Sequence, residues 1–177
     1  MKATVLVAYA SWAGSTHEVA EAIGAALRDD ETTVDVRAAS DVDGIGLYDA
    51  VIAGTAIRIG RPHRDLLRFV ERYRRRLRQV PVAYFVVCLT MKDDTAESRS
   101  QVLSYLDPVR ERAPDVEPVD VGMFGGDVPM AGAVFEQMPL PMQNVIRAMG
   151  GEGDHRDWNL IKSWTERVRP ALLKGRQ

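Results

Sequence analysis

The sequence predicts an α/β fold in which a five-stranded parallel sheet of order 2-1-3-4-5 is doubly wound, with helices on both faces. Short, almost continuous apolar runs alternate with segments whose apolar residues recur at helical spacing. This pattern is typical of a parallel sheet that is buried on both sides. Five such units in a chain of 177 residues match the size of one doubly wound domain. We therefore expect a single domain over residues 1–177.

Each element follows from its own pattern. Strands are expected, in chain order, at residues 3–8, 32–37, 49–53, 82–89 and 116–123. The run 82–89 is apolar throughout and predicts the central strand, whereas 32–37 alternates and predicts a more exposed one. Helices are expected where apolar residues recur every three or four positions, at 18–28, 65–77, 102–109 with an interruption near Pro108, and 158–172.

Composition and charge limit the functional classes. Hydrophobic residues make up 46% of the chain and charged residues 27%, as in ordinary globular proteins. The formal net charge of -2 gives no general attraction to nucleic acid. No secretory signal is visible and no apolar run approaches the ~20 residues of a membrane span. We therefore expect a cytoplasmic protein.

The single cysteine and the three histidines argue against two kinds of site. Cys88 has no partner for an intrachain disulfide or a multi-cysteine zinc site. It lies inside an apolar run, which favours a buried structural thiol over a nucleophile. None of the histidines has metal-ligand spacing with another, so we expect no metal.

The segment between the first strand and the first helix has the residues of a phosphate-binding loop. Ser11, Ser15 and Thr16 offer hydroxyls, and Gly14 lets the backbone curl close to a ligand. The helix N-terminus that follows favours negative charge. The loop has no lysine, which argues against a nucleoside-triphosphate P-loop and favours a phosphate monoester held by neutral donors.

Two further polar loops are expected at the same edge of the sheet. In a doubly wound sheet, ligands bind beyond the carboxyl ends of the strands, at the switch point between strands one and three. The loops that meet there are residues 10–16, 55–61 and 90–97. Three such loops at one edge predict a ligand site more strongly than any one of them.

These segments resemble the flavodoxin superfamily, and within it the branch of menaquinone-dependent protoporphyrinogen IX dehydrogenase. Residues 11–16 (Ser-Trp-Ala-Gly-Ser-Thr) are similar to the loop that holds the FMN phosphate. Residues 48–60 resemble the branch pattern of Tyr-Asp, an apolar strand and then Gly-x-x-Ile-Arg-x-Gly, and His63 fits the segment that follows. Residues 149–154 (Met-Gly-Gly-Glu-Gly-Asp) resemble the Gly-Gly-x-x-Asp element before the last helix.

The resemblance implies a flavodoxin-like fold and a non-covalent FMN. The phosphate would be held by Ser11, Trp12, Ala13, Gly14, Ser15 and Thr16, with Ala13 standing where plain flavodoxins often have a hydroxyl residue. One side of the flavin ring would face Thr55, Ala56, Ile57, Arg58, Ile59 and Gly60, and the other Leu89, Thr90, Met91 and Lys92. Arg58 or Lys92 would stabilise the reduced cofactor. No catalytic residue is assigned.

The expected function is an FMN-dependent oxidoreductase that passes electrons between an organic substrate and a quinone-type acceptor. The alternative is a flavodoxin-type electron carrier that meets a redox partner protein. A non-redox binding module on the same fold is a third class, because fold alone does not give function.

Residues 124–151 form a connection longer than the few residues usual between a strand and a helix. Its apolar and methionine side chains are accompanied by Arg147 as the only cation. A membrane-surface helix would be basic, so we favour a lid or a packing excursion over membrane contact. A methionine-rich surface there also fits a hydrophobic substrate or a second subunit in a homodimer.

Other chemistry-bearing residues have a structural and a functional interpretation. The arginine run at residues 72–78 predicts a solvated helix face, with an acidic electron-transfer partner as the alternative. His63 fits a local structural role or a proton donor near the flavin. Trp12 predicts a cover over the phosphate loop, whereas Trp158 and Trp164 are expected in the core.

Overall fold

The computed structural model describes residues 2–12, 14–128, 133–148 and 153–174. Its main sheet has the order β2-β1-β3-β5-β6, and these five strands are all parallel. Their bounds are β1 (Ala3–Ala10), β2 (Thr32–Ala38), β3 (Ala50–Arg58), β5 (Val82–Cys88) and β6 (Val121–Gly125). In chain order this is 2-1-3-4-5, which confirms the predicted fold class.

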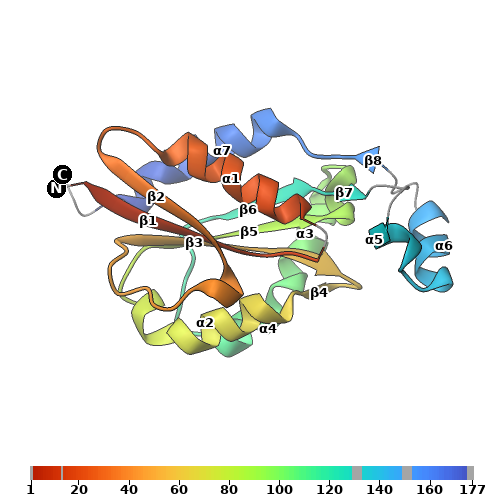
Figure 1. The fold of residues 1–177 in the computed structure, drawn as a ribbon, viewed down its shortest axis with the longest axis horizontal. Coiled ribbons are helices and arrows are strands. Elements are labelled where there is room, and N and C mark those ends of the chain that lie inside the picture. The colour runs from red at the N-terminus through yellow and green to blue at the C-terminus, as the bar shows by residue number, and fades with distance from the viewer. Residues whose placement is uncertain (1, 13, 129–132, 149–152, 175–177) are drawn as a thin grey trace.

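The helices cover both faces of this sheet (Figure 1). One layer holds α1 (Ser15–Leu27) and α7 (Trp158–Leu172). The other holds α2 (Arg64–Leu77), α3 (Ala96–Tyr105) and α4 (Asp107–Arg112). Two short 3-10 turns, η1 (Ala39–Asp41) and η2 (Leu89–Lys92), follow β2 and β5.

Alternate residues of the central strands fill two separate cores. On β1, Val5 and Val7 pack toward α1 and α7, whereas Leu6 and Ala8 pack toward the α2 layer. All four are fully buried. Successive side chains of a strand point to opposite faces, so a strand covered on both sides must be apolar at every position.

Two strand boundaries differ from the sequence prediction by five residues. β3 continues to Arg58, five residues beyond its predicted end, and pairs there with the short antiparallel strand β4 (Arg61–Pro62). The last parallel strand begins at Val121 instead of residue 116. Pro114 and Pro118 lie in the predicted strand or at its border, and proline has no N–H to donate to a ladder.

The predicted break near Pro108 is confirmed, because this proline lies in the first turn of α4, after α3 has ended. Trp164 is 2% exposed and packs in the core as expected. The prediction for Trp158 was wrong: it is 44% exposed, because it begins α7 and lies under the guanidinium of Arg156.

The long connection after β6 leaves the sheet and returns to it. It holds the elements α5 (Ala133–Glu136) and α6 (Leu140–Ala148), between two short strands that pair antiparallel, β7 (Asp127–Val128) and β8 (Gly153–Asp154). Figure 1 shows α5 and α6 beyond the carboxyl ends of the parallel strands. The excursion therefore reaches the edge at which the three loops meet.

Candidate functional site

The first loop turns tightly between β1 and α1. Gly14 has a φ of 88°, a left-handed conformation that favours glycine, and its N–H donates to Ser11 Oγ at 2.9 Å. Ala13 lies outside the described residues. The loop thus brings the start of α1 to the carboxyl end of β1, as the sequence predicted.

Thr16 is the loop residue with the most telling environment. It is 0% exposed, and its Oγ1 has no hydrogen-bond partner among the described residues. Burying a hydroxyl without a partner costs roughly 1–3 kcal/mol. Within the described residues α1 also begins without a side-chain cap, so its first N–H groups remain available to an anion. These donors fit a phosphate.

The second segment is a β-hairpin instead of the expected loop. Its tip is formed by Ile59 and Gly60, with φ values of 50° and 66°. Thr55 is fully buried; its hydroxyl donates to the carbonyl of Ala56 at 2.7 Å and accepts from His63 N at 2.9 Å. Thr55 therefore ties the hairpin to α2, while Ile59, 79% exposed, projects from the tip.

The third segment folds into the turn η2. Met91 is buried in the core beneath it, and Lys92 is exposed. Thr90 Oγ1 lies 3.2 Å from the hydroxyl of Tyr105, and a Cβ added at Gly60 would lie 3.4 Å from the same tyrosine ring. Tyr105, which the sequence analysis did not single out, therefore holds the hairpin against the third segment.

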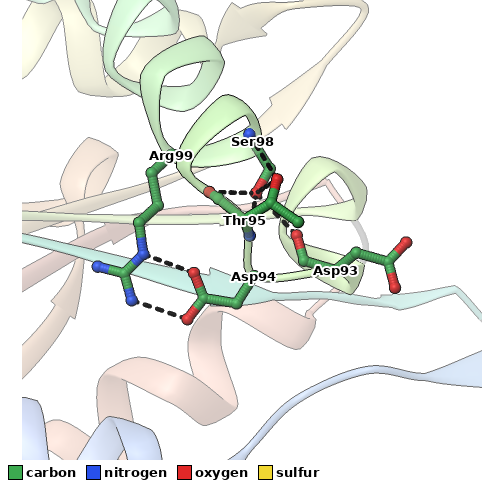
Figure 2. Close-up of polar contacts among 5 residues, drawn as sticks. All are labelled: Asp93, Asp94, Thr95, Ser98 and Arg99. Carbon is green, nitrogen blue, oxygen red and sulfur yellow. Dashed lines mark hydrogen bonds and ion pairs between the residues drawn. The ribbon is translucent and has the colours of Figure 1, made fainter.

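The chain after η2 is held by its own polar contacts (Figure 2). Thr95 and Ser98 form a reciprocal capping box at the start of α3. Arg99 reaches back to Asp94 with two hydrogen bonds of 2.5 and 2.7 Å, which lower the pKa of that carboxyl. The serine hydroxyl also donates to the carbonyl of Asp93 at 2.7 Å. This end of the third loop is thus occupied by structural contacts.

An aromatic and cationic cluster joins the first two segments. The Trp12 ring lies 4.5 Å from the His63 ring, and the Arg58 guanidinium lies 5.9 Å from the Trp12 ring centre. Arg58 also donates to Met142 Sδ of α6 at 3.5 Å. The cluster therefore connects the first loop, the β3–β4 hairpin and helix α6 of the excursion. Trp12 is 40% exposed and lies outside the core, against His63 and Arg58.

His63 has a defined structural role. It caps α2, because its Nδ1 accepts a hydrogen bond from Asp65 N at 3.2 Å. Burial lowers its pKa, opposed by the Asp65 carboxylate. A neutral ring that accepts at Nδ1 carries its proton on Nε2, so this hydrogen bond selects one tautomer of the neutral imidazole. The local structural interpretation is therefore supported by the geometry.

Arg156 joins the end of the excursion to α1. Its side chain is 7% exposed and contacts the carboxylates of Glu18 in α1, of Asp154 at 2.7 Å and of Asp127 at 3.7 Å. These contacts raise the pKa of the guanidinium and lower that of Asp154. Arg156 was not predicted from the sequence, and Asp154 in the Gly-Gly-x-x-Asp element was the only local signal for it. Residues 149–152 of that element lie outside the described residues.

The comparisons with known proteins agree with this architecture. The model of the flavodoxin domain family matches residues 6–147. The chain belongs to the flavodoxin domain family. Its fold is similar to a cysteine-to-serine mutant of flavodoxin from Pseudomonas aeruginosa, at 14% identity and a TM-score of 0.56, covering 97% of this chain and 99% of that one. The comparison with curated proteins finds no match.

Two other solved structures share the fold of this flavodoxin domain. A flavodoxin from the domain Archaea has 17% identity and a TM-score of 0.51, covering 94% of this chain and 99% of that chain. The flavodoxin, WrbA-like protein from Agrobacterium tumefaciens has 17% identity and a TM-score of 0.51, covering 98% and 99%. Family membership supports FMN as the cofactor, and the donors at the start of α1 fit its phosphate.

The described residues of this flavodoxin domain hold neither a metal-binding cluster nor a membrane-spanning helix. Among those residues there is no group of three or more His, Cys, Asp or Glu side chains placed to hold a metal ion. None of the helices described has both the length and the hydropathy to cross a membrane. Cys88 is buried, and burial raises the pKa of its thiol, in accord with a structural cysteine.

Proposed function

We propose that this flavodoxin domain binds FMN at the carboxyl edge of its sheet and transfers electrons through it. The observation that carries the proposal is the buried hydroxyl of Thr16, which lacks a partner among the described residues and lies at the uncapped start of α1. A phosphate at this position accepts from that hydroxyl and from the first-turn N–H groups. The cofactor, when bound, supplies the redox chemistry, and the protein positions it.

Arg58 is the residue best placed to tune the cofactor. It lies between the Trp12 ring and Met142, so its guanidinium is held at the edge instead of extending into solvent. A fixed positive charge beside the flavin stabilises the negative charge that accompanies reduction. Arg58→Gln is expected to lower the flavin reduction potential, and the exposed Lys92 serves as the comparison, with a smaller effect for Lys92→Gln.

In its finer form, we propose an oxidoreductase that resembles protoporphyrinogen IX dehydrogenase and passes electrons from an organic substrate to a quinone-type acceptor. Its support is the Ile-Arg-x-Gly hairpin and the contact of Arg58 with α6, which brings the excursion over the edge. The second candidate is an electron carrier without substrate chemistry. The exposed arginines of α2 favour it, because they offer a surface for a partner protein.

One series of measurements tests both FMN binding and the choice between an oxidoreductase and an electron carrier. Purified protein is stripped of bound flavin and titrated with FMN and, in parallel, with riboflavin, while flavin fluorescence is followed. Tight binding of FMN and weaker binding of riboflavin are expected, because only FMN carries the phosphate. Absence of FMN binding would refute the proposal.

The loaded protein is then assayed for oxidation of protoporphyrinogen IX with menadione as acceptor. Turnover supports the oxidoreductase. Reversible reduction of the bound cofactor without any turnover supports the carrier instead.

A further inference from the structure

Helix α2 concentrates positive charge on a chain that is otherwise acidic. Its residues 64–77 include six arginines and two acidic residues, a formal charge of +4, whereas the whole chain has a net charge of -2. The basic side chains are all arginine. A guanidinium offers a planar pair of donors that matches a carboxylate better than a lysine ammonium does.

Four of these arginines form one exposed row. Arg64, Arg68, Arg72 and Arg75, here called the arginine stripe, are all exposed and fall within about 80° of one another around the helix axis. The opposite side of α2 carries its buried residues, among them Phe69 and Val70. The stripe is therefore the outer face of a helix whose inner face packs on the sheet.

The stripe is almost uncompensated within the described residues. Arg64 and Arg68 share a single carboxylate, Asp65, each at 3.8 Å. Arg72 lies over the ring of Tyr73, and Arg75 contacts no acidic group in the part of the chain that the structure describes. Exposed ion pairs at 3.8 Å contribute little to stability, so the positive charge of the stripe remains largely available to a partner.

On the neighbouring side of the helix, in contrast to the stripe, arginines have close carboxylate partners. Arg74 and Arg78 both bond to Asp115, at 2.5 and 2.9 Å. Arg112 bonds to Glu71 at 2.8 Å. The fold thus gives Arg74 and Arg78 a close carboxylate partner, whereas the stripe has only Asp65, at 3.8 Å, among the described residues.

The stripe begins at the candidate site. α2 starts directly after the β3–β4 hairpin, so Arg64 lies at the carboxyl edge of the sheet. Arg61 of the same hairpin is exposed and contacts no acid among the described residues. The hairpin tip carries Ile59, 79% exposed. An apolar tip beside charged side chains has the anatomy of a protein-docking surface.

We propose that the arginine stripe docks an acidic protein surface beside the cofactor edge. This inference rests on the proposed electron-transfer function and names the chemistry of its partner. The occupant is an acidic redox protein, because the stripe offers carboxylate-binding forks and α2, which is described in full, exposes none of its large hydrophobic residues. A membrane-surface helix would insert apolar side chains, whereas α2 turns its apolar side inward.

The test compares two variants that lose the same charge. In the stripe variant, Arg64, Arg68, Arg72 and Arg75 are each changed to Gln, which has a similar helix propensity. In the control variant, Gln replaces four arginines that have acidic partners, namely Arg74, Arg78, Arg110 and Arg167. Both sets are exposed, and thermal unfolding of each variant verifies the fold.

The probe is a plant-type [2Fe–2S] ferredoxin, an acidic one-electron carrier. Its dissociation constant is measured by titration calorimetry at low ionic strength for flavin-free and FMN-loaded protein. The rate of FMN reduction by the reduced ferredoxin is measured by stopped flow; in each event one electron leaves the cluster, which is oxidised, and enters the bound cofactor.

For the stripe variant we expect binding and rate to fall about fourfold or more, since each of the four exposed pairs contributes a factor of roughly 1.4–5. The control variant should bind like the wild type, and wild-type binding should weaken as salt rises past about 0.1 M. Equal losses in both variants, an unaffected stripe variant or no binding by the wild type would overturn the inference.

Two further outcomes separate this inference from others. A stripe effect seen only with phosphatidylserine vesicles, and absent with ferredoxin, would overturn the protein partner in favour of a membrane surface. If no variant binds FMN but the stripe still decides ferredoxin binding, the docking surface stands and the proposed redox function falls.

Discussion

Replacing the hydroxyl of Thr16 by a methyl group should stabilise the flavin-free protein and weaken FMN binding. Thr16→Val keeps the shape and β-branching of the side chain, so the packing at the start of α1 is preserved. The wild-type Oγ1 is buried and lacks a hydrogen-bond partner among the described residues. The substitution therefore removes a buried polar group that carries an unrelieved desolvation penalty.

The two expected effects have opposite signs. Relief of the unsatisfied hydroxyl should raise the free energy of unfolding of the flavin-free protein by roughly 1–3 kcal/mol. Loss of a hydrogen bond to a charged phosphate costs roughly 1.5–3 kcal/mol, which is about a 10- to 100-fold increase in the dissociation constant for FMN. Riboflavin affinity should hardly change, because riboflavin carries no phosphate.

Urea unfolding measures the first effect and flavin-fluorescence titration the second. Thr165 supplies a matched control, because it is equally buried but its hydroxyl donates to the carbonyl of Ile161 at 2.8 Å. Thr165→Val should destabilise the protein slightly and leave FMN affinity unchanged. If Thr16→Val leaves both the stability and the FMN affinity at wild-type values, this hydroxyl does not serve the phosphate.

Three further perturbations test other parts of the structure. Gly54→Ala should cost about 1–3 kcal/mol or more in urea unfolding, because the added Cβ would collide with the buried ring of Phe85 on the next strand; a wild-type midpoint would contradict this packing. Hydrogen bonds from Arg74, then from Arg78, lower the pKa of Asp115 to about 2. The Asp115 carboxylate therefore stabilises the fold above its ordinary pKa, and this contribution is lost as pH falls from about 4 to about 2. Asp115→Asn should flatten the dependence of stability on pH in that window. An unchanged slope would count against the ion pair. Arg156→Gln leaves three carboxylates without their shared cation, so amide exchange should quicken at β7 and β8 with little change in the core, as hydrogen-exchange mass spectrometry would detect; unaltered exchange there would mean that this arginine does not hold the excursion.

Local periodicity was enough to predict the five parallel strands, their order and the helices that cover them. The continuous apolar run of β5 and the three-to-four spacing on α2 and α7 each report burial along a single element. Buried positions recur with the period of the helix or strand that carries them. The sequence of a single element is therefore enough to reveal whether it is a helix or a strand and which side is buried. The first loop was predictable for the same reason, because its glycine and hydroxyl residues lie next to one another.

The hairpin and the exposure of Trp158 were not predictable in this way. The sequence pattern of residues 55–58 indicated a loop. They instead extend β3, and this extension is paired with β4, which exists only because the chain reverses at Gly60. Trp158 fits an apolar helical stripe, but its place at the start of α7 leaves it over Arg156 at the surface. In both cases the structure depends on a contact with a residue outside the repeating pattern of the segment itself, namely β4 for the hairpin and Arg156 for Trp158.

By itself the sequence determined the doubly wound sheet, the covering helices and the position of the loop between β1 and α1. Only the tertiary structure decided that Thr16 loses its hydrogen-bond partners on burial and that Arg156 joins α1 to the end of the excursion, across 138 positions of sequence. It also decided which arginines at α2 are neutralised, since the carboxylate of Asp115 that bonds to Arg74 and Arg78 lies on a later segment of the chain. Desolvation and charge pairing depend on what surrounds a group in space, and neighbours distant in the chain are set only when the layers pack.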